Sequence, residues 1–488
     1  MVFSSVIFLH YFLPLAVLAG VGSQWLLGTR VANGVLLALS VLFYAWGLGA
    51  DFVWLLAVSV AVNFALAIAA EAARDRGRDS EIRAVQIATI VFNISLLGYF
   101  KYANFFVAQT ASLRDAIGLP PLMWEHVALP IGISFFTFHA LSYVFDVASG
   151  RCNALRNPVD LALYICFFPQ LIAGPIIRYH AIDTQIARRT ITVEDLGEGA
   201  VRFVHGLVKK VILADPAGAI ADTCFSASAG DMTSAVAWLG AVAYTIQIYF
   251  DFSGYSDMAI GLARMFGFRF PENFDRPYAS LSITEFWRRW HITLSAWFRD
   301  YVYIPLGGSR GGPVRTYANL ITVFALTGLW HGANWTFVVW GIYHGALLII
   351  ERVLGLRYVD EAERASLSRS AIALRRALTM LLVIIGWVIF RSDSMAAALR
   401  VLQPMFVIDF QGIPELVAYK LAPDNLLLLA VGVGLCLLPA DFKGREAYHA
   451  ARKNVQVAAI AGLLIIALPA ALIRVASQSF SPFLYFQF

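Results

Sequence analysis

Charged residues are scarce in this chain of 488 residues. Asp, Glu, Lys and Arg together make up only 14% of it, whereas hydrophobic residues make up 59%, and the mean hydropathy is +0.69. Soluble domains carry about 25% charged residues, because their surfaces must stay in contact with water. The composition therefore excludes a soluble protein and predicts an integral membrane protein.

Cysteine is also rare and shows no paired spacing. The four copies are Cys152, Cys166, Cys224 and Cys436. Disulfide frameworks and zinc sites both need paired or closely spaced cysteines, so we predict neither a disulfide nor a metal site. Isolated cysteines of this kind are typical of helix packing.

Long apolar runs fill the sequence, whereas the short alternating segments of a β-barrel are missing. A spanning helix needs about 20 apolar residues. We therefore predict an all-α polytopic membrane protein with about eleven spanning helices, give or take about two. The runs lie near 3–21, 31–48, 52–70, 84–107, 127–148, 158–176, 234–250, 316–330, 333–350, 377–390, 424–440 and 455–473. The first run has no basic residue before Arg30 and so lacks the positive segment of a signal peptide, which predicts a retained helix.

Basic residues predict the topology, since short loops rich in Lys and Arg stay on the cytoplasmic side. Arg74, Arg76, Arg78 and Arg83 define the first inner loop. Later basic segments are 151–156, 188–189, 209–210, 375–376 and 443–453. This pattern predicts that both termini lie outside. It also explains the net charge of +5 without nucleic acid, because the basic residues are scattered among inner loops.

We expect one membrane domain with four parts. Residues 1–126 are peripheral scaffold helices, 127–350 a catalytic core, 351–474 C-terminal helices and 475–488 an extracytoplasmic tail. Helices are expected to end near residue 107, followed by an external loop at 108–126. The Gly-Pro pair at 174–175 predicts a helix break at membrane depth, which hydrocarbon tolerates only beside other protein or a cavity.

An amphipathic segment is expected at about 181–210. Thr192 is suited to cap the helix that follows it, with Asp195 three residues further on. This spacing is close to that of a capping box.

Two carboxylates, Asp251 and Asp257, lie in an apolar helix. Ionised groups at such depth are costly unless they are paired or functional. One interpretation is structural, in which they anchor backbone or an arginine in a helix broken around Gly254. The other is that they take part in function.

Residues 285–301 combine basic and aromatic side chains. A single helix over this range would place Arg288, His291, Ser295 and Arg299 on one side and aromatic residues on the other. Such a helix is typical of a membrane surface, where its arginines would bind headgroups. A sharper interpretation is that four arginines bind a phosphate-bearing cytosolic donor, because guanidinium forks suit phosphates. These arginines are Arg288, Arg289, Arg299 and Arg310.

His331 lies deep in apolar sequence, between LITVFALTGLW and GANWTFVVW. A neutral imidazole at this depth can accept a proton from an alcohol. A buried histidine with a structural role is the alternative.

Several blocks of sequence together carry a resemblance to a known family. They are FFPQLIAGPIIR, YFDFSGYSDMAIG, PENFDRPY, EFWRRWHITLSAWFRDYVYIPLGG, GLWHGANWTFVVWGIYHG and the terminal FLYFQF. In this order they resemble the membrane-bound O-acyltransferase family, in particular its bacterial alginate O-acetylation branch. The resemblance covers about 129–345 and the tail.

The resemblance implies a ring of about eleven tilted helices, with re-entrant and interfacial helices, around a tunnel in the bacterial inner membrane. It implies acyl transfer from acetyl-CoA as co-substrate, with no bound cofactor. The family's membrane-embedded histidine falls on His331 and its second motif histidine on His291. His331 would act as general base, and His291 would polarise the thioester or shape the funnel. Trp330, Asn334, Asp251 and Asp257 would then line or support the tunnel.

The tail SPFLYFQF places Tyr485 near the end of the sequence. It resembles the Phe-x-Tyr-x-x-Phe ending of the small partner protein in teichoic acid D-alanylation systems, which implies that Tyr485 relays the acyl group to an extracytoplasmic SGNH-type transferase. The alternative is an aromatic anchor in the lipid interface. For the whole chain, the alternatives are an acyltransferase with a carrier-protein donor and a polytopic transporter.

Overall fold

The computed structural model describes residues 2–48, 50–120, 123–356, 361–407, 409, 411–439, 442, 448 and 450–477. Within these ranges every regular element is helical and no strand occurs, as the apolar runs predict. The longer helices are α1 (Leu13–Leu27), α2 (Thr29–Leu48), α3 (Val53–Asp75), α4 (Asp79–Leu97), α5 (Ala103–Ala116), α6 (Ile133–Ala148), α10 (Val193–Val208), α11 (Asp215–Phe225), α12 (Ser234–Met265), α15 (Gly312–His331), α16 (Trp335–Val353), α18 (Arg369–Arg391), α19 (Met395–Met405), α21 (Pro423–Leu437), α23 (Lys453–Gly462) and α24 (Leu468–Ser477). The shorter ones are α7 (Pro158–Cys166), α8 (Phe168–Leu171), α9 (Asp183–Ala187), α13 (Ile283–Arg289), α14 (Ile292–Phe298), α17 (Glu361–Ser366) and α20 (Glu415–Lys420).

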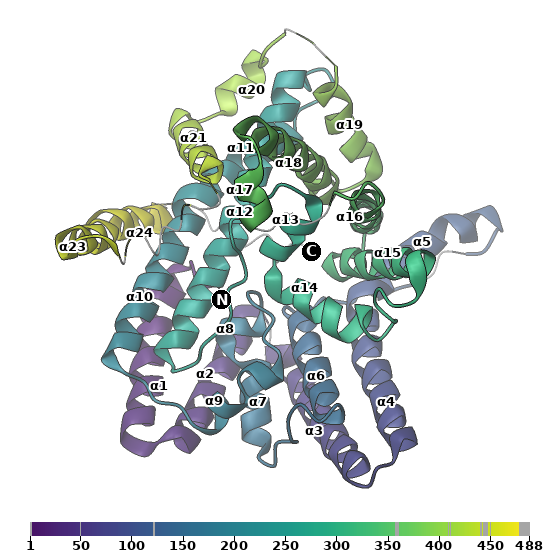
Figure 1. Cartoon of the computed structure of the whole chain (residues 1–488), viewed down its shortest axis with the longest axis vertical. Coiled ribbons are helices and arrows are strands. Elements are labelled where there is room, and N and C mark those ends of the chain that lie inside the picture. The colour runs from purple at the N-terminus through teal and green to yellow at the C-terminus, as the bar shows by residue number, and fades with distance from the viewer. Residues whose placement is uncertain are drawn as a thin grey trace. The chain divides into compact units, whose positions relative to one another are not determined.

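The chain forms two compact units, and α10 and α12 contribute residues to both. The first unit comprises Met1–Phe203 and Met258–Pro271. In it α1 and α2 form a hairpin (Figure 1), turned by Gly28 at a left-handed φ of 83°. Helices α3, α4 and α6 pack on one another.

Polar residues in the first unit pair with one another. Asn63 on α3 and Asn93 on α4 exchange amide hydrogen bonds of 3.2 and 2.9 Å. Such reciprocal pairing satisfies amide groups inside apolar helices, where an unpaired group is costly.

The Gly-Pro break is confirmed. Helix α8 ends at Leu171, and Gly174 adopts a φ of 111°. A neighbouring block packs on this break, since a Cβ at Gly132 would lie 2.5 Å from the Leu171 carbonyl oxygen. The Tyr164 hydroxyl donates to the freed Ile177 carbonyl at 2.8 Å, which satisfies one backbone group released by the break.

The cap at the start of α10 is also confirmed. The Thr192 hydroxyl accepts from the Asp195 backbone N–H at 3.1 Å, and the Asp195 carboxylate accepts from the Thr192 N–H at 3.2 Å. This reciprocal pair is a capping box with Asp in the acidic position. It fixes where the amphipathic segment turns into helix.

The second unit comprises Val204–Asp257 and Glu272–Phe488. Its closest helix pair is α15 and α16, which are joined by three residues and lie side by side (Figure 1). Their approach depends on two glycines. A Cβ at Gly328 would lie 2.2 Å from the Phe337 carbonyl oxygen, and one at Gly341 would lie 2.2 Å from that of Phe324. Small residues at helix crossings allow this backbone contact in membrane proteins.

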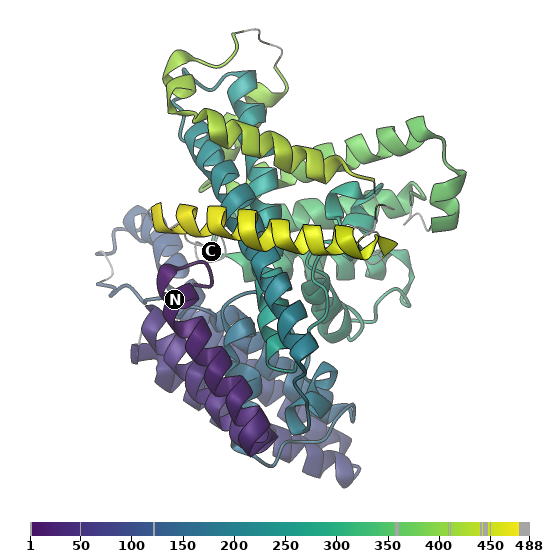
Figure 2. The ribbon, with the colours of Figure 1, turned by 90° about the vertical axis from the view of Figure 1, so that its left-hand side faces the viewer.

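The last helical stretch, Lys453–Ser477, forms one long rod that joins α23 and α24 (the yellow segment in Figure 2). Many of its apolar side chains are exposed, Ile465 and Ile466 among them. An apolar helix of this kind is suited to lipid contact, because lipid tails replace the missing protein neighbours.

Among the described residues, eight helical stretches are long and apolar enough to cross a membrane. They are Phe8–Leu27, Thr29–Trp46, Ala50–Asp75, Asp79–Ala116, Ser234–Met265, Trp335–Val353, Arg369–Arg391 and Lys453–Ser477. Helices α6 and α21 are apolar but shorter. The chain is thus an all-α multi-pass membrane protein. The count of about eleven spans and the four-part division of the chain stay predictions.

The expectations for the end of α5 and for the course of α12 are wrong. Helix α5 continues to Ala116, so the expected loop at 108–126 begins later, because residues 108–116 continue the helix without an intervening Gly or Pro. Helix α12 runs unbroken through Gly254. That glycine allows a close contact instead, since a Cβ there would lie 2.7 Å from the Gly206 carbonyl oxygen.

We predict that Gly328→Ala destabilises the protein by about 1–3 kcal/mol, because the new methyl group overpacks the contact between α15 and α16. The measurement is the free energy of unfolding in detergent, followed by tryptophan fluorescence. Gly434→Ala on α21 is the matched control, since nothing lies within 4 Å of a Cβ at that position. Equal stability of the two variants would contradict the role of the Gly328 contact.

Candidate active site

His331 is the last residue of α15, and its side chain is almost completely buried. Three aromatic rings surround it. The centroid distances from its imidazole are 4.8 Å to Trp330, 5.2 Å to Trp340 and 5.1 Å to Phe390. The last two rings meet it at nearly right angles. This packing fixes the orientation of the imidazole, which a general base requires.

A short turn after His331 reverses the chain. Gly332 is extended and closely packed, since a Cβ there would lie 2.2 Å from the Phe337 ring. Asn334 then caps α16, accepting from the Thr336 backbone N–H at 3.1 Å, and its amide donates to the Asp393 carbonyl at 2.8 Å. Asn334 therefore has a capping role in the turn that carries His331.

His291 lies between two short helices and is completely buried. It precedes α14 and adopts a left-handed φ of 44°. The single helix expected over 285–301 is therefore wrong: α13 ends at Arg289, Trp290 is extended and α14 begins at Ile292. The chain breaks here because backbone groups on both sides of the turn pair with another segment.

That segment is the PENFDRPY block. The Asp275 N–H donates to the Arg289 carbonyl, and the Ile292 N–H donates to the Asn273 carbonyl, each at 2.9 Å. The Asn273 side-chain oxygen lies 3.1 Å from His291 Nδ1 and also accepts from the Thr293 hydroxyl at 2.9 Å. Asn273 thus holds the imidazole in place, and this pairing brings two separate motif blocks together.

Trp330 links the two histidines. Its indole lies 6.2 Å from the His291 ring and 4.8 Å from the His331 ring, measured between centroids. The sequence places these residues in blocks about 40 positions apart, and the structure brings them to one aromatic cluster.

Burial lowers the pKa of His291, which lies outside the candidate spans, to about 3. The cause is loss of water around the charged form. His291 is therefore neutral at physiological pH. A neutral imidazole can donate a hydrogen bond to a carbonyl group without carrying a charge into the site.

Two carboxylates, one on α16 and one on α13 itself, anchor the short helix α13. Glu351 on α16 accepts from the Ile283 N–H and, at 2.8 Å, from both the N–H and the hydroxyl of Thr284. Glu285 accepts from the Leu281 N–H at 2.8 Å and pairs with Arg289 and Arg364. A helix this short does not form alone, so these bonds determine where its side chains lie.

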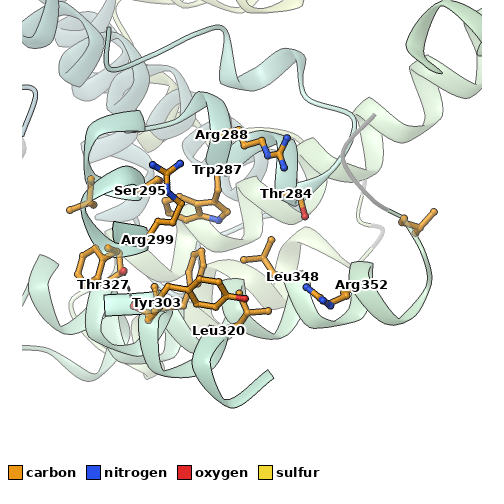
Figure 3. A pocket seen from close by; sticks show the side chains of 15 residues that line it. Thr284, Trp287, Arg288, Ser295, Arg299, Tyr303, Leu320, Thr327, Leu348 and Arg352 are labelled. Atoms are coloured by element: carbon orange, nitrogen blue, oxygen red, sulfur yellow. Dashed lines mark hydrogen bonds between the residues drawn. The ribbon is translucent and has the colours of Figure 1, made fainter. Parts of the chain in front are cut away.

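A cavity of about 620 Å³ opens between α13, α14, α15 and α16 (Figure 3). Most of its lining is apolar, with Leu294, Phe298 and Phe324 among the residues that form it. Thr327 also lines it, one helical turn before His331 on the same face of α15, because residues four apart share a helix face. His331 itself is not a lining residue.

Three arginines line the same cavity: Arg288, Arg299 and Arg352 (Figure 3). Arg299 is bonded to its neighbour Asp300 at 2.7 Å, whereas Arg352 forms no ion pair within the described part of the chain. Arg289 is directed to Asp275 and Glu285 instead, and neither it nor Arg310 lines the cavity. Arg288 and Arg299 were predicted from the basic motif, whereas Arg352 was not, because it lies outside that motif.

Asp251 and Asp257 are paired, but with other partners than expected. Asp251 lies 2.8 Å from the Lys210 ammonium, and Asp257 lies 2.7 Å from that of Lys209 and 3.3 Å from His205 Nδ1. Both close ion pairs are thus formed with lysines and not with the arginine that the structural interpretation named. The lysines begin a π-helical turn at Lys209–Ala214. Pairing lowers the cost of burying these charges.

Among the described residues no group of three or more His, Cys, Asp or Glu side chains could hold a metal ion. Tyr485 lies outside the described residues.

Asn273 and Glu351 were not singled out from the sequence. Asn273 stands in a quoted motif, but nothing in its spacing indicates that it bonds to His291 across 18 positions.

We predict that His291→Asn changes how stability depends on pH. In the unfolded chain this imidazole titrates at its ordinary pKa of 6.5, and in the fold at about 3. Between these values the unfolded state binds a proton that the folded state does not, so the free energy of unfolding falls as pH drops, by up to about 1.4 kcal/mol per pH unit. Asparagine tolerates the left-handed backbone and removes this titration.

The measurement is the melting temperature in detergent at pH 7.5, 6 and 5. The wild-type value should fall more steeply than that of His291→Asn, and other buried histidines cancel because both proteins carry them. Parallel pH profiles would contradict the buried neutral state of His291.

The chain is similar in sequence to several known proteins. Residues 133–390 match the sequence model of the membrane-bound O-acyltransferase family. The chain is 43% identical to the probable alginate O-acetylase AlgI of Pseudomonas putida, over 100% of both chains. It is 33% identical to the peptidoglycan O-acetyltransferase of Helicobacter pylori, over 83% of this chain and 80% of that one. It is 28% identical to the teichoic acid D-alanyltransferase of Bacillus subtilis, over 45% and 58%.

These matches include every element of the candidate site between α6 and α18 and, for the Pseudomonas relative, extend over the full length of both chains. With its multi-pass helical fold, the chain belongs to the membrane-bound O-acyltransferase family.

Proposed function

We propose that this protein transfers acetyl groups from cytoplasmic acetyl-CoA across the bacterial inner membrane for O-acetylation of an alginate-like exopolysaccharide. One observation carries the proposal: a cavity with apolar walls and three arginines has Thr327 in its lining, one helical turn from the buried His331. The similarity to an alginate O-acetylase over the full length of both chains supports this choice of acceptor.

In the proposed reaction His331 takes the proton of the acceptor hydroxyl as its oxygen attacks the thioester carbonyl. A new C–O bond forms and the C–S bond breaks. The proton then passes from His331 to the departing thiolate of coenzyme A. His291, neutral and held by Asn273, polarises the thioester carbonyl or orients the donor.

The donor in this proposal enters through the cavity of Figure 3. Its phosphates meet Arg288, Arg299 and Arg352, and its uncharged pantetheine arm lies along the apolar walls. Arginine forks suit phosphate oxygens, and apolar walls suit an arm without charge. Arg289 and Arg310 remain part of the wider basic region. No cofactor is bound in this scheme, because the thioester itself supplies the activated acyl group.

Tyr485 is the proposed first acceptor. It would carry the acetyl group as a phenyl ester to an extracytoplasmic SGNH-type transferase. In this proposal both termini lie on the outer side, and membrane lipids surround the helices. The distribution of basic loops supports this orientation. An aromatic interfacial anchor is the alternative role for the tail.

A carrier-protein donor is the second candidate, favoured by the partial similarity to a teichoic acid D-alanyltransferase. A transporter is the third, favoured only by paired charges within apolar helices, Asp251 with Lys210 and Asp257 with Lys209. The two candidates predict different assay results. A carrier-dependent enzyme shows no turnover with free acetyl-CoA, and a transporter shows no turnover with any donor.

We predict that His331→Ala reduces acetyl transfer about 10²–10⁴-fold, the contribution of a positioned general base. Purified protein is incubated with labelled acetyl-CoA, and coenzyme A release and the labelled peptide are measured by mass spectrometry. His126→Ala, which changes an exposed loop histidine, is the control. Wild-type rates in His331→Ala would contradict the base.

The same experiment tests the relay. Label on Tyr485 in the wild type, lost in Tyr485→Phe, supports the phenyl ester. Rapid coenzyme A release without label indicates direct transfer to another acceptor, and unchanged polymer acetylation in Tyr485→Phe would rule out the relay.

We also predict that Arg352→Gln raises the KM for acetyl-CoA about tenfold and leaves kcat nearly unchanged, because a charge-assisted hydrogen bond to a phosphate contributes about 1.5–3 kcal/mol. Lys420→Gln removes an equal charge from an exposed helix and controls for long-range electrostatics. Equal KM values for the two variants would place the phosphates elsewhere.

A further inference from the structure

A second cavity, in the first unit, differs in character from the cavity of Figure 3. It measures about 430 Å³ and lies at the junction of α9, α10 and the end of α12. Its lining is mostly polar. Four arginines face it, Arg188, Arg189, Arg264 and Arg269, against two carboxylates, Glu194 and Asp195.

Two of these arginines are already neutralised. Arg269 lies 2.5 Å from the Asp195 carboxylate, and Arg264 lies 3.5 Å from it and also pairs with Glu198. Burial raises the pKa of Asp195, but the bonds from Arg269 and Thr192 outweigh it and hold that pKa below its usual value. Asp195 is therefore ionised, and it is the counterion of Arg264 and Arg269.

Arg189 is different, because it is 92% buried and forms no ion pair with any described residue. Its guanidinium donates to the Phe266 carbonyl at 3.0 Å and to Asn33 Oδ1 at 2.6 Å, both uncharged. It also lies 4.4 Å above the Phe268 ring. Its Nη2 atom has no hydrogen-bond partner within the described part of the chain.

The charge of Arg189 is thus left without a close counterion. Burial lowers its pKa only to about 10, so it stays charged, and Asp160 acts on it from beyond ion-pair distance. Asp160 is itself bonded to Asn33 and Asn157. A buried charge without a partner is costly, which indicates that an anion completes this site.

Arg188 stands at the same cavity, exposed, and its side chain makes no bond to any described residue. The loop that carries both arginines is held firmly: Gln24 donates to the Arg189 carbonyl at 3.1 Å, and the Trp25 indole donates to the Ile191 carbonyl at 2.9 Å. The site is therefore preformed.

We propose that this cavity binds a phosphate-bearing anion between Arg188 and Arg189. Guanidinium forks match phosphate oxygens, and Thr190 and Thr192 line the same space. The volume of about 430 Å³ leaves room for an organic group on the phosphate. Two sources share this chemistry: an anionic phospholipid headgroup and a soluble organic phosphate. The loop is basic, which predicts the cytoplasmic side, where anionic lipids are attracted to such segments.

The test compares phospholipid and soluble phosphate on the full-length protein in neutral detergent. Retained lipid is counted by native mass spectrometry after mixing with phosphatidylglycerol or phosphatidylcholine, and the melting temperature is followed with adenosine 3′,5′-bisphosphate. We expect the wild type to bind one of the two phosphates and Arg188→Gln to bind it about tenfold more weakly, the loss of one charge-assisted bond. Arg78→Gln, at an exposed turn, should bind like the wild type.

Arg189→Gln should abolish binding, but its bonds to Phe266 and Asn33 also support the loop. Arg188→Gln breaks no such bond and therefore decides the question if the other variant does not fold. Preference for phosphatidylglycerol over phosphatidylcholine identifies the lipid source. Stabilisation by the bisphosphate that weakens in Arg188→Gln identifies the soluble one, whereas stabilisation that is equal in both proteins comes from the cavity of Figure 3. Binding of neither, or equal binding by Arg188→Gln and the wild type, would overturn the proposal. Acetyl transfer is measured in a separate assay. Whether a variant loses or keeps that activity does not test phosphate binding in this cavity.

Discussion

The candidate active site depends on the backbone contact between α15 and α16. Gly328 and Gly341 let the two helices touch at their carbonyl groups, and a three-residue turn joins them at one end. This contact places His331 at the end of α15 against Trp340 of α16. A larger residue at either glycine separates the helices, and with them the imidazole from the ring that orients it. The geometry of the candidate site therefore depends on two residues that have no side chain.

Polar bonds then fix the segments that are too short to fold alone. Helices α13 and α14 have seven residues each, and neither has the length to be stable by itself. Glu351 anchors the start of α13, and Asn273 anchors the turn that carries His291. In a low-dielectric environment such bonds are strong when satisfied and costly when broken. These bonds therefore satisfy the buried polar groups and also determine the shape of the site.

The sequence predicts the parts of this arrangement that depend on local signals. The helix break at Gly174, the Thr192–Asp195 cap and the burial of His331 follow from glycine and proline conformations, capping spacing and hydropathy. The division of 285–301 does not, because it results from backbone bonds to Asn273 and Asp275. The helical pattern of arginines and tryptophans there is real, but tertiary pairing overrides it. The lysine partners of Asp251 and Asp257 are likewise a long-range result, because the π-helical turn that presents them carries no sequence signature.

The two cavities show how the same residue type serves different chemistry in different surroundings. Around the cavity of Figure 3 the arginines accompany leucine and phenylalanine walls. This lining suits the proposed donor, which combines anionic phosphates with an uncharged arm. In the first unit the arginines stand among threonines and carboxylates, so the anionic group alone determines binding. Arginine is suited to both because its planar fork bonds in fixed directions and remains charged when buried. The two sites differ because only the cavity of Figure 3 has mostly apolar walls, and these walls result from helix packing.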